Sequence, residues 1–168
     1  FEEAGIDVSY ASSVLVGIMN EFPGVGRRFE RIAPGVYSDY GHHPEEIQVT
    51  VETAKEEAER LGLKGVVVVY QPHQNVRQHE VRKGYKKVFL GAEKVFWLPT
   101  YLTREDPNLR ILEPEELIRE LENAEVGEKA ELGDKLAEEI REYLRQGYLV
   151  ILMTAGPADD WLREKFAD

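Results

Sequence analysis

"KGVVVVYQP", residues 64–72, is the stretch of sequence that decides the fold. The five consecutive residues from Val66 to Tyr70 all favour a strand, and no polar residue alternates with them. A strand that is apolar on both sides is typical of a sheet that is covered on both faces. The sequence therefore predicts a buried strand over residues 66–70.

The segment before this strand predicts a long helix. In "HHPEEIQVTVETAKEEAERLG", residues 42–62, the apolar side chains recur in steps of three and four. Pro44 stands at a first-turn position and Gly62 marks the end. Elsewhere the pattern predicts strands over 35–40, 94–99 and 148–153 and helices over 80–92, 113–122, 133–147 and 158–168. Because strands alternate with helices, we expect an α/β fold: a three-layer, Rossmann-like, mostly parallel sheet with helices on both faces.

The bulk properties of the chain restrict its class. Its 168 residues are 42% apolar and 32% charged, which is typical of one soluble globular domain. The absence of cysteine excludes disulfides and thiolate chemistry, and no export leader is evident, so we expect a cytoplasmic location. The net charge of -11 argues against nucleic acid and membrane surfaces as partners. Anionic ligands would need a local basic cluster such as Arg27, Arg28 and Arg31.

Residues 1–20 lack the strand and helix pattern of the rest of the chain. We expect them to be an interdomain tail or connector, and residues 21–168 to form the domain. In a parallel sheet, ligands bind beyond the carboxyl ends of the strands. Three loops qualify, at residues 38–44, 71–80 and 154–160.

The first two of these loops carry side chains suited to a site. Asp39 follows a predicted strand, where it could meet a ligand hydroxyl or cap the turn, and both readings stay open. The histidines are His42, His43, His73 and His79. We expect no metal there, because adjacent histidines seldom point at one ion and no H-E-x-x-H helix is present. Histidine can instead hydrogen-bond to a ligand or stack on it.

Several familiar motifs are absent. Gly24-x-Gly26 has no third glycine at the dinucleotide spacing, and there is no G-x-x-x-x-G-K-[ST] phosphate loop. No serine lies in a G-x-S-x-G motif. The sequence alone therefore does not predict triphosphate binding or nucleophilic catalysis by this chain.

Four segments together resemble a known family. They are "FPGVGRRFE" (22–30), "DYGHHPEEI" (39–47), "VVVVYQPH" (66–73) and "ILMTAGPADDW" (151–161). In this order they resemble the C-terminal domain of the Mur ligases, ATP-dependent enzymes of peptidoglycan synthesis. The resemblance is closest to the ligases that join L-alanine to UDP-N-acetylmuramate, and it spans about residues 20–162.

The resemblance implies a division of labour between domains. In the family a central domain binds ATP and Mg²⁺, an N-terminal domain holds the UDP sugar, and the C-terminal domain brings the amino acid. The implied partners are therefore UDP-N-acetylmuramate, L-alanine and the upstream domains of the same protein. The amine of the amino acid would attack an acyl-phosphate, so this domain would supply orientation and no catalytic residue, and alone would be inactive.

The resemblance also implies roles for individual residues. Arg28 matches the nucleotide-side arginine and Asp39 the ribose-side acid, and Tyr40 and His42 line the same cleft. The remaining two residues, His73 and Arg77, match positions that face the amino acid. A guanidinium fork at Arg77 would pair with its carboxylate.

This sequence departs from the family pattern at several positions. Gln74 stands where the alanine ligases usually have arginine, Ser38 where an aspartate is common, and Ala158 where a glycine is common. The identity of the amino acid therefore stays open. Three alternatives stay open: a ligase domain that recycles murein peptides, a non-catalytic binding module of the same fold, and a small enzyme that uses its histidines as acid and base.

Overall fold

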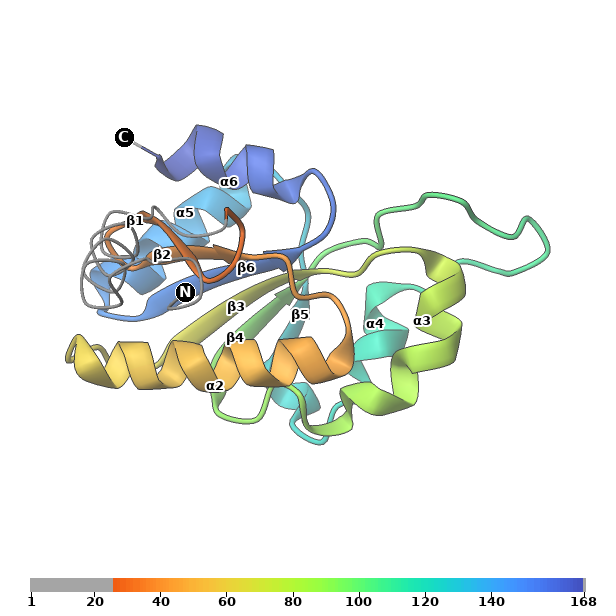
Figure 1. Ribbon diagram of the computed structural model, residues 1–168, viewed down its shortest axis with the longest axis horizontal. Helices are drawn as coiled ribbons and strands as arrows, with labels where there is room; N and C mark the ends of the chain where they lie inside the picture. The colour runs from red at the N-terminus through yellow and green to blue at the C-terminus, as the bar shows by residue number, and fades with distance from the viewer. Residues whose placement is uncertain (1–25, 168) are drawn as a thin grey trace, which may run out of the picture.

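The computed structural model describes residues 26–167, so the predicted tail at residues 1–20 lies outside the described part (Figure 1). The strands are β1 (Glu30–Ala33), β2 (Val36–Asp39), β3 (Val66–Gln71), β4 (Ala92–Trp97), β5 (Gly127–Lys129) and β6 (Leu149–Thr154). They form one sheet in the order β1-β2-β6-β3-β4-β5. β1 runs antiparallel to β2, and all other neighbours pair in parallel.

Helices cover both faces of this sheet. They are α2 (Pro44–Arg60), α3 (Asn75–Val81), α4 (Pro114–Ile118), α5 (Asp134–Arg145) and α6 (Ala158–Phe166), with 3₁₀ turns η2 (Arg82–Lys87) and η3 (Ala124–Val126). Figure 1 shows α2 on one side of the sheet and α5 and α6 on the other. The predicted mostly parallel, three-layer α/β fold is therefore confirmed.

The central strand β3 shows why three layers form. Val66, Val68 and Tyr70 point into the core on the α2 side, which also contains apolar residues of α2. Val67 and Val69 point into the second core, which contains apolar residues of α5 and α6. All five side chains are fully buried. Because both faces are apolar, the strand is stable only when it is covered on both sides.

The predicted helix over 80–92 is wrong. An α-helix begins earlier, at Asn75, and gives way at Arg82 to the 3₁₀ turn η2, after which residues 88–91 form turns. The early start depends on the carboxylate of Glu105, which accepts the backbone N–H groups of Asn75 and Val76 at 3.0 and 3.2 Å. Glu105 therefore satisfies two donors of the first helical turn from a distant loop.

The predicted helix over 113–122 is shorter than expected, because α4 ends at Ile118. β5 follows, and a Cβ on its first residue, Gly127, would lie 2.6 Å from a methyl carbon of Ile118. The glycine thus allows the strand to approach α4 closely. Within the described residues, no helix has the length and apolar character needed to cross a membrane.

Candidate functional site

The three predicted loops leave the sheet at the same edge. They follow β2, β6 and β3, which are neighbours in the sheet and run parallel. A fourth segment joins them after β4: Tyr101 pairs with the β3–α3 loop through backbone hydrogen bonds to Pro72 (2.8 Å) and from Gln74 (3.0 Å). The carboxyl ends of four strands therefore contribute to one edge.

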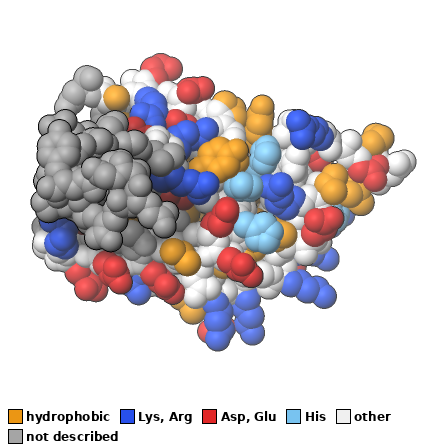
Figure 2. All heavy atoms as spheres, in the orientation of Figure 1, with side chains coloured by type: hydrophobic (Ala, Val, Ile, Leu, Met, Phe, Trp, Pro, Cys, Tyr) orange, Lys and Arg blue, Asp and Glu red, His pale blue; other side chains and the backbone are white. Residues whose placement is uncertain are grey.

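Four rings form a continuous row along this edge, which we call the aromatic row: Tyr40, His42, His73 and Tyr101. The ring centroids of Tyr40 and His42 are 5.4 Å apart, and those of His42 and His73 are 5.7 Å apart. Tyr101 stacks on His73 with an interplanar angle of 13°. In Figure 2, histidine side chains gather near the middle of the face, with basic side chains on both sides. Sequence analysis did not identify Tyr101, although it follows a predicted strand.

The basic end of the row is formed by Arg27 and Arg28. Their guanidinium groups lie 4.9 and 5.5 Å from the centroid of the Tyr40 ring, within cation–π distance. Arg27 also donates hydrogen bonds to the carbonyl oxygens of Thr154 (2.6 Å) and Gly156 (3.2 Å), so it is held by the β6–α6 loop. Arg28 is exposed to solvent and is the arginine better placed to meet a ligand.

The β6–α6 loop packs closely against the other end of the row. A Cβ on Gly156 would lie 2.5 Å from Oε1 of Gln71 and 3.0 Å from Cγ of Tyr101. The same Gln71 oxygen accepts a hydrogen bond from the hydroxyl of Thr154 at 2.8 Å. These contacts fix the β3, β4 and β6 ends relative to one another, and they require glycine at position 156.

Asp39 is only 6% exposed and its carboxylate is already occupied. It accepts hydrogen bonds from the backbone N–H groups of Phe29 (2.8 Å) and Gly41 (2.7 Å) and from the hydroxyl of Thr50 (3.2 Å). Of the two roles that the sequence left open, the structure shows the capping one. A contact between Asp39 and a ribose stays a prediction.

Ser38 hydrogen-bonds to a network of charged groups that also includes Arg27, which lies 3.7 Å from the carboxylate of Asp159. Its hydroxyl donates to the carboxylate of Asp159, which also accepts from Arg163 at 2.9 Å. Arg163 pairs as well with Glu30 of β1 at 2.7 Å, and this hydrogen bond is the main cause that lowers the pKa of Glu30. The network ties the edge strand β1 to α6 and so supports the segment that carries both arginines.

The amino-acid side of the predicted site contains two polar atoms without partners. Within residues 26–167, Nη1 of Arg77 and Nδ1 of His73 are buried and make no hydrogen bond. Both lie at the β3–α3 junction, where Gln74 has a positive φ of 63° and the helix starts one residue later. Because a buried polar group without a partner is costly, the pair is suited to a ligand that supplies an acceptor for Arg77 and a donor for His73.

The imidazole of His73 has a lowered pKa. Burial is the largest cause, followed by the positive charges of His42 and Arg77. The ring is thus neutral at neutral pH, and a neutral imidazole can accept a hydrogen bond whereas an imidazolium cannot. Among the described residues, no group of three His, Asp or Glu side chains could hold a metal ion.

This lowered pKa predicts a loss of stability in mild acid. His73 in the unfolded chain takes up a proton near its ordinary pKa of 6.5, whereas in the folded chain it does so only at lower pH. The contribution of neutral His73 to the free energy of unfolding is therefore complete above about pH 6.5. It is lost as the pH falls toward the pKa of His73 in the folded chain. Carboxylates with lowered pKa titrate below about 4.5, outside this window.

We expect urea unfolding to give a smaller free energy at about pH 5.5 than at about pH 7.5, and the difference to shrink in His73→Gln. His43→Gln, at an exposed position on the neighbouring loop, is the matched control and should keep the wild-type difference. An unchanged pH dependence in His73→Gln would contradict the prediction.

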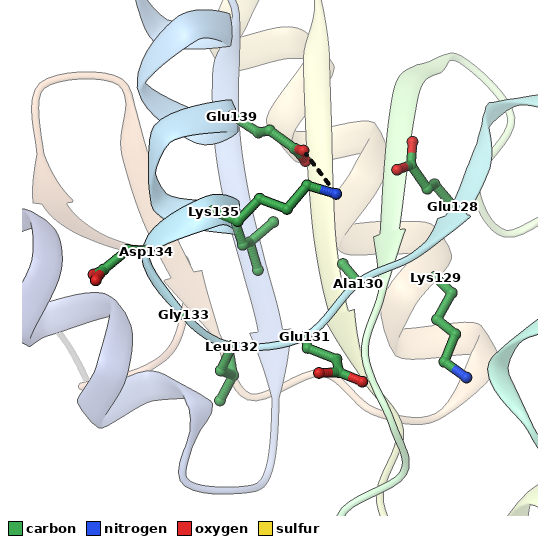
Figure 3. A pocket seen from close by; sticks show the side chains of 10 residues that line it. Glu128, Lys129, Ala130, Glu131, Leu132, Gly133, Asp134, Lys135 and Glu139 are labelled. Atoms are coloured by element: carbon green, nitrogen blue, oxygen red, sulfur yellow. Dashed lines mark ion pairs between the residues drawn. The ribbon is translucent and has the colours of Figure 1, made fainter.

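A separate hollow of about 410 Å³ lies between β5 and α5 (Figure 3). Its lining is mostly charged and exposed, and it includes an ion pair between Lys135 and Glu139 at 3.6 Å. It contains none of the predicted site residues. Volume alone does not make a site, so we place the candidate site at the aromatic row, where buried polar atoms of His73 and Arg77 lack partners.

Known proteins resemble this chain over most of its length. The family model described as "Mur ligase, glutamate ligase domain" matches residues 27–156. The chain is 29% identical over 168 residues to a UDP-N-acetylmuramate–L-alanine ligase of Rickettsia felis, covering 95% of this chain and 34% of that protein. It is 33% identical over 141 residues to the corresponding ligase of Caldicellulosiruptor saccharolyticus, covering 81% of this chain and 30% of that protein.

A solved structure shows the same fold. A murein peptide ligase from Psychrobacter arcticus superposes with a TM-score of 0.56 at 18% identity, covering 89% of this chain and 31% of that one. At this identity the likeness concerns the fold alone. The chain spans about a third of the length of the relatives that it matches.

Proposed function

The chain belongs to the Mur ligase family, and from this premise we propose that it orients an amino acid for amide bond formation with the acyl-phosphate of UDP-N-acetylmuramate. The relatives are ligases, so the longer protein that carries this domain is expected to be an enzyme. The observation that carries the proposal is the pair of unpartnered buried nitrogens on Arg77 and His73, beside the aromatic row.

In this proposal Arg77 holds the carboxylate of the amino acid. Its guanidinium can donate two parallel hydrogen bonds to a carboxylate, which fixes both position and direction. His73, which is neutral, can accept a hydrogen bond from the amine. Holding the amine in the right orientation at attack distance can lower the activation barrier by several kcal/mol, and by about 7–11 kcal/mol at the upper end. Closure of the domain would also exclude water from an acyl-phosphate that water hydrolyses.

The nucleotide side of the proposal involves Arg28, with Tyr40 and His42 next to it. An exposed guanidinium fits a phosphate or a hydroxyl of ATP, and the packing on Tyr40 restricts its direction. Most contacts to ATP and Mg²⁺ would come from an upstream domain, because the phosphate-loop motif is absent from this sequence. L-alanine is the proposed amino acid. Because the departure at Gln74 leaves the identity of the joined amino acid open, a ligase that joins a murein peptide is the second candidate.

The test uses the full-length protein encoded by the natural gene. We expect phosphate release from ATP that requires both UDP-N-acetylmuramate and an amino acid, with L-alanine more effective than a tripeptide. Release that requires the tripeptide would favour the murein peptide ligase. No release with either substrate would overturn the ligase proposal and favour a binding module. Turnover by the 168-residue chain alone would show that this fold holds a complete active site.

A further inference from the structure

A buried chain of hydrogen-bonding side chains connects the two histidine loops. The hydroxyl of Tyr70 lies 3.2 Å from the carbonyl oxygen of His42 and 2.9 Å from the hydroxyl of Tyr85. The Tyr85 hydroxyl donates to Oε1 of Gln78 at 2.5 Å, and Nε2 of Gln78 donates to the carbonyl oxygen of His73 at 3.1 Å. The three linking side chains are fully buried.

From this chain of contacts we infer that Tyr85 and Gln78 are positioning residues, which fix the distance between the His42 loop and the His73 loop. The sheet alone does not fix that distance. The two loops follow β2 and β3, which are not neighbours, because β6 lies between them. The buried chain spans this gap under the aromatic row, and it reaches the backbone of both loops.

The number of hydroxyl protons determines which group donates and which accepts at each hydrogen bond of this buried series. Gln78 uses its amide nitrogen for His73, so its oxygen must accept, and the proton of Tyr85 is committed to that oxygen. The single proton of Tyr70 then serves either Tyr85 or the carbonyl of His42. Burial raises the pKa of both phenols, so both remain protonated donors at neutral pH. A buried chain of this kind tolerates the loss of a member poorly, because the remaining groups have no water to replace it.

The inference rests on the proposed function only in treating His42 and His73 as site residues. Tyr85→Phe removes one hydroxyl and keeps the ring that packs against Trp97 in the core. The matched control is Tyr37→Phe. It also removes a hydroxyl from a buried tyrosine, but that hydroxyl donates to Glu57 at 2.7 Å, outside the two loops.

The experiment uses NMR on the 168-residue protein, without ATP or amino acid. It measures the contact between the two histidine rings and the titration midpoint of His73. In the wild type and in Tyr37→Phe we expect a nuclear Overhauser contact between the rings of His42 and His73. In Tyr85→Phe we expect this contact to weaken severalfold and the titration midpoint of His73 to move. Should Tyr85→Phe fail to fold, Tyr70→Phe, which removes the hydroxyl that joins Tyr85 to the carbonyl of His42, is expected to weaken the contact in the same way.

An unchanged ring contact and midpoint in a folded Tyr85→Phe, with a loss of thermal stability equal to that of Tyr37→Phe, would overturn the inference. The hydroxyl would then serve stability alone. Because no substrate is present, this result is separate from any failure of the ligase proposal: absence of amino-acid-dependent turnover would leave the ring contacts unaffected.

Discussion

Asp39→Ala is expected to reduce the free energy of unfolding by about 3 kcal/mol or more, since an unsatisfied buried donor costs about 1–3 kcal/mol. The substitution leaves the backbone N–H groups of Phe29 and Gly41 and the hydroxyl of Thr50 without their acceptor. The position is nearly closed to solvent, so water can replace the carboxylate only in part. Urea unfolding of the chain measures the change in the free energy of unfolding. The slope of this free energy against urea concentration should stay the same, which shows that the unfolded state is unaltered.

The matched control is Asp160→Ala, which removes an exposed aspartate in the first turn of α6 and should cost no more than about 1 kcal/mol. An Asp39→Ala variant as stable as this control would show that the capping carboxylate is dispensable. The prediction also affects how activity data are read. Loss of activity on replacing Asp39 would support a contact with a ribose only if the variant is shown to be folded under the assay conditions.

The helices and strands that were predicted correctly are those whose own residues favour the structure, without contacts from distant segments. The apolar run at 66–70 became β3, and the pattern of apolar residues with Pro44 at the start became α2. The grouping of the candidate residues followed from topology. Tyr40, His42 and His73 follow the parallel strands β2 and β3, which end at one edge of the sheet. Arg28 precedes β1, which begins at the same edge because it runs antiparallel to β2.

The elements that were missed depend on contacts between distant segments. α3 begins where Glu105 accepts its first N–H groups from about thirty positions away in the sequence, and no local pattern signals this. β1 and β5 are short edge strands with exposed polar residues, so they lack the apolar period of a buried strand. Tyr101 joined the aromatic row because the backbone after β4 pairs with the β3–α3 loop.

If the proposed function holds, Arg77→Ala is expected to raise the KM for the amino acid by about a hundredfold in the full-length protein. Truncation of one partner of a buried, hydrogen-bonded charge pair costs about 2–5 kcal/mol, and each 1.4 kcal/mol is about tenfold. The KM for ATP should change less than about twofold, because Arg77 lies in the first turn of α3 and Arg28, the proposed nucleotide-side residue, is at the other end of the aromatic row. Steady-state kinetics with each substrate varied in turn measure both values.

Two further variants separate the geometry of the Arg77 side chain from its charge. Arg77→Lys keeps the charge but loses the planar fork, so we expect a KM for the amino acid between those of the wild type and of Arg77→Ala. Arg82→Ala removes an arginine of the adjoining turn η2 that pairs with Glu120 at 3.8 Å, and it should leave both KM values unchanged. Equal increases in the two KM values for Arg77→Ala would mean that the residue supports the whole site, and the carboxylate of the amino acid would need another partner.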